Sequence, residues 1–276
     1  MAATKVPDRL SEQLRVSPEH KLVLRKFDAN ETYGWVREDA EAEQAQYETK
    51  LTDLQERVWA EGKHSVLIVL QGIDAAGKDG TVRHVMDAFN PQGCRVVGFK
   101  APTPEELRHD FLWRIHAHTP AKGTVAIFNR SHYEDVLVVR VHGLVPKRIW
   151  QDRYRSINEF ERTLAQEGTT IVKFFLYIDR DEQRERLQAR LDDPDKRWKF
   201  SSADLPEREK WDDYIAAFQD ALTRTSTEWA PWYLIPANRK WFRNLAVAHV
   251  LGETLEALDP KYPPAEAGLE SIVIPK

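Results

Sequence analysis

A segment at residues 72–79, GIDAAGKD, has the spacing G-x-x-x-x-G-K that is typical of a phosphate-binding loop. Glycines at this spacing let backbone N–H groups turn toward phosphate oxygens, and the lysine adds a positive charge. A tight structural turn is the alternative, but the apolar run before the segment and the helix-compatible sequence after it favour phosphate binding. The residues that we expect at the phosphates are Gly72, Ala75, Ala76, Gly77, Lys78, Asp79 and Gly80.

Two carboxylates distinguish this segment from the usual pattern. Asp79 follows Lys78, at the position where a Ser or Thr hydroxyl normally holds Mg²⁺, and Asp74 lies inside the loop. Carboxylate oxygens are themselves common Mg²⁺ ligands. The sequence therefore predicts a phosphate-handling site with altered metal chemistry, in which Asp74 is a metal ligand.

A second charged segment follows the strand expected at residues 124–129 and reads Arg130-Ser-His-Tyr-Glu134-Asp135. P-loop enzymes place a second acidic element at such a strand end to help hold Mg²⁺, and Glu134 or Asp135 fits that role. Arg130 and Asn129 would lie near the phosphates, where a guanidinium can bind oxygens bidentately. An exposed charged turn is the alternative, but the position beside the phosphate loop favours function. We expect His132 to be structural.

A third cluster, at residues 180–199, contains Arg190, Arg197 and Lys199 around a proline hinge. Its composition alone would suit an ordinary solvated helix face. The acids are grouped at residues 192–195, however, and three bases at residues 196–199 follow together beyond the proline. This grouping favours a mobile lid at about residues 190–210 that brings cations over transferring phosphates. We expect Arg83, in the helix after the phosphate loop, to line the path of a bound polyanion.

The whole composition restricts the partners and the location. Forty basic and 44 acidic residues give a net charge of −4 over 276 residues, so no global field recruits nucleic acid or an anionic membrane. A single cysteine, Cys94, excludes an internal disulfide framework. We find no apolar core of a signal peptide and no apolar run of membrane-spanning length, so we expect a soluble cytoplasmic protein.

The elements that must position these residues alternate between strands and helices. This alternation predicts one α/β domain at residues 39–276, with a parallel five-stranded sheet and ligands at the carboxyl ends of its strands, after an irregular arm at residues 1–38. A capping box at Thr103–Glu106 secures one helix start, and a similar device is expected at Asp204–Glu207. The expected strands cover residues 65–71, 95–100, 124–129, 170–179 and 232–236. The expected helices cover residues 39–61, 78–89, 104–118, 146–167, 205–225 and 238–257.

Four segments in order resemble the family-2 polyphosphate kinases, and within them the subgroup often called class III: GIDAAGKDG, PTPEELRHDFLWRIH, FNRSHYEDVLVVRVH and DPDKRWKFS. The similarity runs over about residues 21–264. It implies a thymidylate-kinase-like P-loop fold and phosphoryl transfer between inorganic polyphosphate and adenine nucleotides, with Mg²⁺ as cofactor. It also implies a homo-oligomer, dimer or tetramer, and Trp229 and Trp232 are candidates for a subunit contact.

The resemblance implies individual roles as well. Asp74, Gly77 and Lys78 match the phosphate loop, and Arg190 and Arg197 match lid cations. Many family members have Asp where this chain has Asn129, and Asn where it has Glu134; the Glu-Asp pair resembles the subgroup that accepts nucleoside mono- and diphosphates. The candidate catalytic residues are Asp74, Lys78, Arg130, Glu134, Asp135, Arg190 and Arg197, with Asp74 and Asp135 as metal ligands.

Two other functions compete with this hypothesis. An ATP-dependent nucleoside monophosphate kinase usually keeps a hydroxyl after the P-loop lysine, so Asp79 and Asp74 count against it. A non-catalytic P-loop module that binds polyphosphate or nucleotide would not require the lid cations and the acidic pairs.

Overall fold

The computed structural model describes residues 10–18 and 22–275 and contains one five-stranded sheet of order β2-β3-β1-β4-β5. Every strand pair is parallel, as the sequence predicts. Because helices cover both faces of such a sheet, β1 reads as a continuous apolar run and is buried along its whole length. The strands are β1 (Ser65–Gln71), β2 (Cys94–Gly98), β3 (Val125–Asn129), β4 (Thr169–Tyr177) and β5 (Trp232–Pro236).

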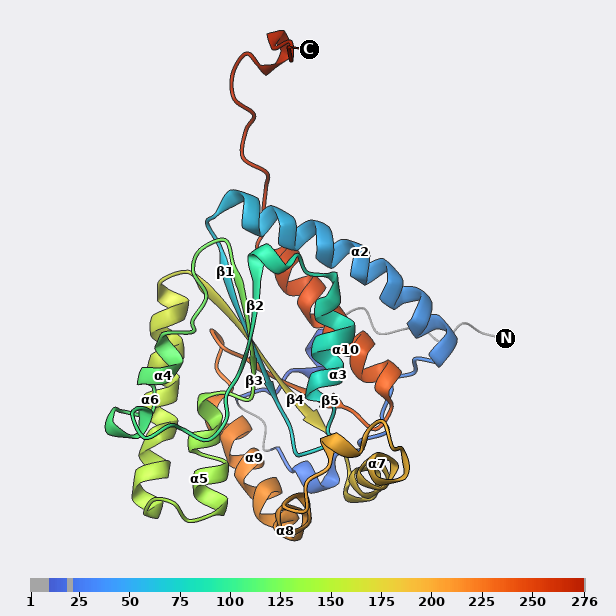
Figure 1. Ribbon diagram of the computed structural model, residues 1–276, viewed down its shortest axis with the longest axis vertical. Coiled ribbons are helices and arrows are strands. Elements are labelled where there is room, and N and C mark those ends of the chain that lie inside the picture. The colour runs from blue at the N-terminus through green and yellow to red at the C-terminus, as the bar shows by residue number, and fades with distance from the viewer. Residues whose placement is uncertain (1–9, 19–21, 276) are drawn as a thin grey trace.

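Helices form a layer on each face of the sheet. Figure 1 shows α2, α3 and α10 on one side and α4, α5, α6 and α9 on the other, while α7 and α8 lie near the strand ends where the sheet meets the P-loop. This arrangement leaves the carboxyl ends of the strands free to hold a ligand site. The helices are α1 (Leu10–Leu14), α2 (Arg37–Glu61), α3 (Lys78–Val85), α4 (Trp113–His116), α5 (Val138–Val141), α6 (Lys147–Gln166), α7 (Arg180–Asp192), α8 (Asp204–Glu209), α9 (Trp211–Thr225) and α10 (Lys240–Ala257).

The described part of the N-terminal arm packs on the body. Arg15 forms an isolated antiparallel bridge with Tyr233, and the Val16 N–H donates to the Trp232 carbonyl at 2.8 Å. The arm therefore covers the β5 edge of the sheet, and Leu14 is 1% exposed there. Residues 1–9 and 19–21 of this predicted arm lie outside the described residues.

The single helix predicted at residues 104–118 is wrong. Its capping box is present, because the Glu106 N–H donates to Thr103 Oγ1 at 3.2 Å and the Thr103 N–H to Glu106 Oε2 at 2.6 Å. The helix nevertheless ends after one 3-10 turn (Glu106–Arg108) because His109 is extended, with φ −108° and ψ 172°. Asp110 Oδ1 then accepts the Leu112 N–H at 2.9 Å, a local turn that competes with helix. Only α4 follows.

The helix predicted at residues 205–225 is also divided, into α8 and α9. Lys210 lies between them with ψ 17°, outside the helical range. The predicted cap is wrong as well: Asp204 Oδ2 accepts the Ser201 N–H at 3.3 Å, and the Glu207 N–H donates to the Ala203 carbonyl instead. The Glu207 carboxylate instead accepts the Tyr214 hydroxyl at 2.6 Å, a contact that joins the two helices across the break.

Trp232 is not available for a subunit contact, which corrects that expectation. Its side chain is 1% exposed, and its indole N–H donates to Thr225 Oγ1 at 2.9 Å inside the core. Trp229 is 40% exposed. The sequence pattern does not reveal that Trp232 is buried. A parallel strand that is covered on both faces lacks the alternation of polar and apolar residues that would mark its inward-facing positions.

Candidate active site

The P-loop connects the carboxyl end of β1 to the start of α3. Gly77 and Ala75 have positive φ values of 105° and 66°, which a tight loop between strand and helix requires. A side chain at Gly77 would also collide with the Arg243 guanidinium, since a Cβ there would lie 2.1 Å from Nη1. The loop thus depends on glycine at this position for two separate reasons.

The start of α3 presents free N–H groups. The Thr81 N–H donates to the Gly77 carbonyl at 2.9 Å, which is the first hydrogen bond of the helix. The N–H groups of Lys78, Asp79 and Gly80 come before it and therefore have no partner within the helix. Together with the positive end of the helix dipole, they form an anion-binding position. The Ala76 N–H donates to the Ile73 carbonyl at 3.0 Å inside the loop, so a phosphate contact from that amide stays a prediction.

Lys78 is folded into the P-loop. Its side chain is 9% exposed, and Nζ donates to the Gly72 and Ile73 carbonyls at 2.6 and 3.3 Å. The pKa of Lys78 is lowered to about 8, mainly by burial and secondly by the positive charge of the nearby Arg130 guanidinium. An ammonium held by two carbonyls in this way can exchange them for phosphate oxygens.

This pKa predicts an alkaline limit to substrate binding. As the pH rises through about 8, free protein loses the Lys78 proton and its attraction for polyphosphate, so kcat/KM for polyphosphate is expected to fall by about tenfold per pH unit. The measurement is a pH profile of kcat/KM. The control is Lys78→Arg, whose guanidinium stays protonated, so the limb should be missing. A wild-type profile that stays level to pH 10 would contradict the assignment.

The loop after β3 lies beside the P-loop because Asn129 at the end of β3 pairs in register with Leu70 of β1. Arg130 follows with φ 63°, a left-handed conformation that is rare outside glycine and clusters at functional sites. Ser131 then caps the 3-10 turn at His132–Asp135 by accepting the Tyr133 N–H at 3.2 Å. The strained residue is thereby aimed at the P-loop.

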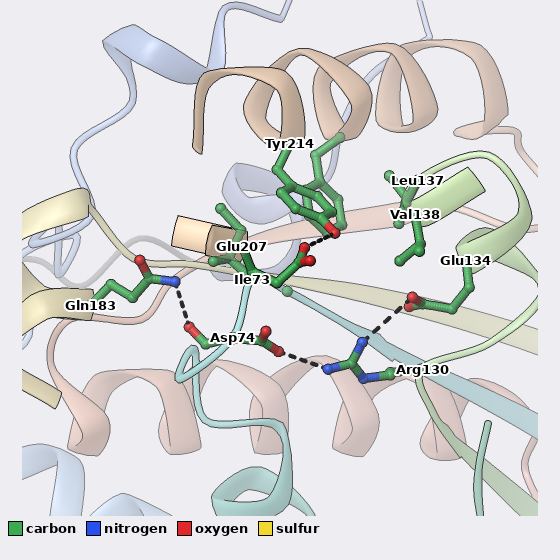
Figure 2. A pocket seen from close by; sticks show the side chains of 11 residues that line it. Ile73, Asp74, Arg130, Glu134, Leu137, Val138, Gln183, Glu207 and Tyr214 are labelled. Carbon is green, nitrogen blue, oxygen red and sulfur yellow. Dashed lines mark hydrogen bonds and ion pairs between the residues drawn. The ribbon is translucent and has the colours of Figure 1, made fainter. Parts of the chain in front are cut away.

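Arg130 links two acidic side chains in one pocket. Its Nη2 donates to Asp74 Oδ1 at 2.7 Å, and its Nη1 lies 3.5 Å from Glu134 Oε2 (Figure 2). The pKa of the Glu134 carboxyl is raised by burial, against the opposing charges of Arg130 and Lys78. The pocket is lined by Gly72, Ile73, Asp74, Arg130, Glu134, Leu137, Val138, Gln183, Glu207, Tyr214 and Phe218.

The two unusual positions of the sequence, Asp79 and Asn129, bond to each other. Asn129 Nδ2 donates to Asp79 Oδ1 at 2.7 Å across the gap between the β3 end and α3. The amide thus occupies one oxygen of the carboxylate that replaces the usual P-loop hydroxyl. The two departures from the usual patterns are therefore in direct contact.

Asp135 lies outside the residues that line the pocket. Its Oδ1 accepts from Arg153 Nη1 at 3.0 Å, and Arg114 Nη2 lies 3.9 Å from Oδ2. The pKa of Asp135 is raised by burial, which these two arginines oppose. Its predicted role as a metal ligand stays a prediction.

A buried polar network supports the loop that carries Arg130 and Glu134. Lys173 Nζ donates to Glu161 Oε2 at 2.6 Å and to the Tyr133 hydroxyl at 2.8 Å, and His132 Nε2 lies 3.1 Å from Glu161 Oε1. These side chains are 0% exposed. Although burial acts against it, the Lys173 charge and then His132 hold the pKa of Glu161 below its usual value. His132 is structural, as expected.

Removing one partner of this ion pair should destabilise the fold strongly. Lys173→Met leaves the Glu161 carboxylate buried without its cation, which is expected to lower the free energy of unfolding by about 3–5 kcal/mol. Urea unfolding followed by circular dichroism measures the loss. The double variant Lys173→Met/Glu161→Gln, which removes both charges, should recover part of it. A single-variant loss below about 1 kcal/mol would contradict the prediction.

The predicted lid cations bond within their own segment. Arg190 Nη1 donates to the Lys199 carbonyl at 3.3 Å, and Arg197 Nε to the Leu191 carbonyl at 2.8 Å. Lys199 lies over the Trp198 ring, which is 78% exposed. None of these residues lines the pocket. Arg83 is an exposed residue of α3.

Several residues of the site were not predicted from the sequence. Gln183 of α7 donates to the Asp74 carbonyl at 3.1 Å, and Arg186 of the same helix donates to the Ala75 and Ala76 carbonyls at 2.9 Å each. Glu207 and Tyr214 close the pocket from α8 and α9. No spacing in the sequence signals them, because they come from helices that only the fold brings to the P-loop.

The site combines a buried lysine at a helix N-terminus, a guanidinium beside it and two carboxylates just beyond the ends of adjacent parallel strands. This combination is typical of a P-loop phosphotransferase. A family model described as polyphosphate kinase 2 (PPK2) matches residues 35–263. The chain belongs to this family of enzymes, which use polyphosphate to phosphorylate nucleotides.

Individual relatives agree with this. The chain is 54% identical to an AMP/ADP-polyphosphate phosphotransferase of Meiothermus ruber over 95% of this chain and 99% of the relative. It is 50% identical to an ADP-polyphosphate phosphotransferase of Rhodopseudomonas palustris over 78% of each chain. A crystal structure of polyphosphate kinase 2 from Arthrobacter aurescens TC1 matches with a TM-score of 0.93 and 45% identity, over 98% of this chain and 97% of that one. Within the described residues, no helix has the length and apolar character to cross a membrane.

Phosphotransfer in this family is generally metal dependent. No three His, Cys, Asp or Glu side chains converge as a metal site among residues 10–18 and 22–275. Asp74 and Glu134 nevertheless line the same pocket. Because Mg²⁺ commonly binds through one or two carboxylates together with substrate phosphates and water, this donor set fits a metal shared between protein and substrate.

Proposed function

We propose that the chain transfers the terminal phosphate of inorganic polyphosphate to ADP and to AMP, reversibly and with Mg²⁺. The observation that carries the proposal is the convergence of Lys78, Arg130 and two carboxylates in one place at the strand ends. The acceptor range is supported by the name of the Meiothermus ruber relative, which covers both AMP and ADP.

The phosphates at the reacting centre are bound by Lys78 Nζ and the N–H groups at the start of α3. Phosphoryl transfer requires alignment, charge neutralisation and exclusion of water more than covalent chemistry by the protein. The acceptor phosphate already carries an anionic oxygen, so no strong general base is needed. Asp74 orients that oxygen, and Arg130 stabilises the equatorial oxygens of the group in transfer.

The lid completes the site when it closes. Arg190 and Arg197 then exchange their backbone carbonyl partners for phosphate oxygens and act in the manner of arginine fingers, and Lys199 contributes to phosphate binding. Closure also excludes water, which would otherwise hydrolyse the donor. Arg83 lies along the path of the polymer.

The metal would be held by Asp74 and by one carboxylate of the loop after β3. To bind the metal, Asp135 would have to release the guanidinium of Arg153, whereas Glu134 already lines the pocket. When bound, Mg²⁺ neutralises phosphate charge and helps to align donor and acceptor.

One assay separates this function from its rivals. Protein, Mg²⁺, ADP and long-chain polyphosphate should yield ATP, and AMP in place of ADP should yield ADP. Formation of ADP from ATP and AMP without polyphosphate would instead indicate a nucleoside monophosphate kinase. Polyphosphate binding without any turnover would indicate a non-catalytic module.

We further propose a cytoplasmic homo-oligomer, dimer or tetramer. The cytoplasm supplies the nucleotide acceptors, and Trp229, which is 40% exposed, is a candidate contact residue. Light scattering of the purified protein tests the assembly, and cell fractionation tests the location.

A further inference from the structure

Arg243 is a buried arginine that pairs with no carboxylate among the described residues. It lies in the first turn of α10 and is 3% exposed, and its Nε and Nη2 both donate to Asn244 Oδ1, at 3.1 and 2.8 Å. Burial, and then the neighbouring Arg186, lowers the pKa of Arg243 to about 10, and no acid of the described residues opposes this. A buried cation without a counter-charge is costly, so we expect an anion from outside the chain to complete it.

The guanidinium of Arg243 lies against the P-loop. A Cβ placed on Gly77 would be 2.1 Å from Nη1, and one on Gly80 would be 3.3 Å from Nη2. These glycines flank Lys78 at the start of α3, where the free N–H groups form the anion-binding position. The nearest anion that could neutralise Arg243 is therefore a phosphate bound next to this position.

Arg186, the closest other cation, is already committed to protein groups. It forms an ion pair with Glu182 at 2.6 Å. Its two terminal nitrogens donate to backbone carbonyls of the P-loop and of the loop before α10, namely those of Ala75, Ala76, Ala237 and Asn238. Arg186 therefore holds the P-loop in place, whereas Arg243 has donor capacity left for a ligand.

The positive charge continues from Arg243 to the surface. Lys240 is exposed and lies three residues earlier on α10. Its pKa is lowered by the partial burial of its ammonium group and then by Arg186 and Arg243. The N-terminus of this 18-residue helix adds the positive end of its dipole at the same place. Positive charge is therefore present both beside the P-loop, at Arg243, and at the surface of the same helix turn, at Lys240.

We propose that Arg243 and Lys240 form a second phosphate subsite beside the P-loop, which binds phosphates of the donor chain beyond the one transferred. The inference rests on the proposed function, because it concerns the donor of that reaction. A condensed phosphate repeats its negative charge at every phosphorus and can contact each cation in turn. A nucleoside triphosphate would instead place a sugar and a base there, which leave a buried guanidinium without an anion.

Calorimetric titration of nucleotide-free protein with long-chain polyphosphate tests the subsite. Arg243→Met should raise the dissociation constant by about tenfold or more, since hydrogen bonds to charged groups are lost, and Lys240→Ala by about threefold. With tripolyphosphate, whose three phosphates we expect to end at the P-loop and Arg243, Lys240→Ala should have a smaller effect than with long-chain polyphosphate. Arg148→Met removes an 81% exposed cation from α6, on the other face of the sheet, and is the matched control.

Turnover gives an independent readout. Arg243→Met should raise KM for polyphosphate while KM for ADP stays within about twofold, and Arg243→Lys, which keeps the charge, should recover part of the affinity. If Arg243→Met does not fold, Arg243→Lys and Lys240→Ala carry the test.

Two different outcomes would contradict the two proposals. A dissociation constant for polyphosphate that changes no more than in Arg148→Met would overturn the proposed subsite. Absence of ATP formation by the wild-type protein would contradict the proposed function instead.

Discussion

Alanine in place of Lys78 is expected to lower kcat by at least about 10³-fold, or about 4 kcal/mol in activation free energy. The reason is that Lys78 Nζ lies inside the P-loop, where it donates to the Gly72 and Ile73 carbonyls at 2.6 and 3.3 Å. Without it, the charge that develops on the transferred phosphate loses its nearest cation. ATP formation from ADP and polyphosphate at saturating substrate measures the loss.

Two controls make this result specific to the site. Lys122→Ala removes an exposed lysine just before β3, at the end of the strands opposite to the P-loop, and should leave kcat unchanged. Far-ultraviolet circular dichroism and thermal unfolding should show that Lys78→Ala is folded, because the lost contacts are two hydrogen bonds to P-loop carbonyls. A folded Lys78→Ala enzyme with near-normal turnover would refute the role assigned to the P-loop.

The second large effect is expected for Asp74→Asn, with a loss in kcat of about 10²-fold or more. The amide keeps the shape of the side chain and can still accept from Arg130 Nη2, whose distance to Oδ1 is 2.7 Å. It removes the negative charge that, in the proposed mechanism, orients the acceptor oxygen and holds Mg²⁺. The Mg²⁺ concentration for half-maximal rate should therefore rise together with the fall in kcat.

Asp152→Asn serves as its control, since this carboxylate is 56% exposed on α6 and forms a 3.7 Å pair with Arg148. It should change neither kcat nor the Mg²⁺ requirement. An Asp74→Asn enzyme that loses turnover with an unchanged Mg²⁺ requirement would show that Asp74 acts on the acceptor and not on the metal.

The sheet and the P-loop could be predicted because their signals are local. β1 is buried along its whole length, and its residues 66–70 therefore read as an unbroken apolar run just before the P-loop. The P-loop follows at fixed spacing, so Lys78 and the start of α3 are set by adjacent residues. β5 matches its expected bounds of Trp232–Pro236 for the same reason.

The helix breaks and the far walls of the site could not be predicted in this way. The 104–118 segment has helical composition, yet an extended His109 ends its first turn, and that backbone conformation has no signature in the spacing. Gln183, Tyr214 and Arg243 reach the P-loop from α7, α9 and α10. Their contacts are set by how helices distant in the chain pack on the sheet, which periodicity alone does not encode.

Asp79 and Asn129 illustrate the boundary between the two cases. Each departure from the usual pattern is visible in the sequence, and Asp79 with Asp74 indicates altered metal chemistry. Only the parallel register of β1 and β3 shows that the two side chains bond to each other, at 2.7 Å. A pair that satisfies itself leaves Asp74 as the P-loop carboxylate that faces the pocket.

The central claim is that the start of α3 and Lys78 hold the donor phosphates. Crystals of the protein soaked with a methylene-bridged polyphosphate, which cannot transfer its phosphate, test it most directly. The account predicts phosphate oxygens within hydrogen-bonding distance of Lys78 Nζ and of the N–H groups of residues 78–80, with the chain continuing toward Arg243. An analogue bound elsewhere on the molecule, with the P-loop free, would contradict it.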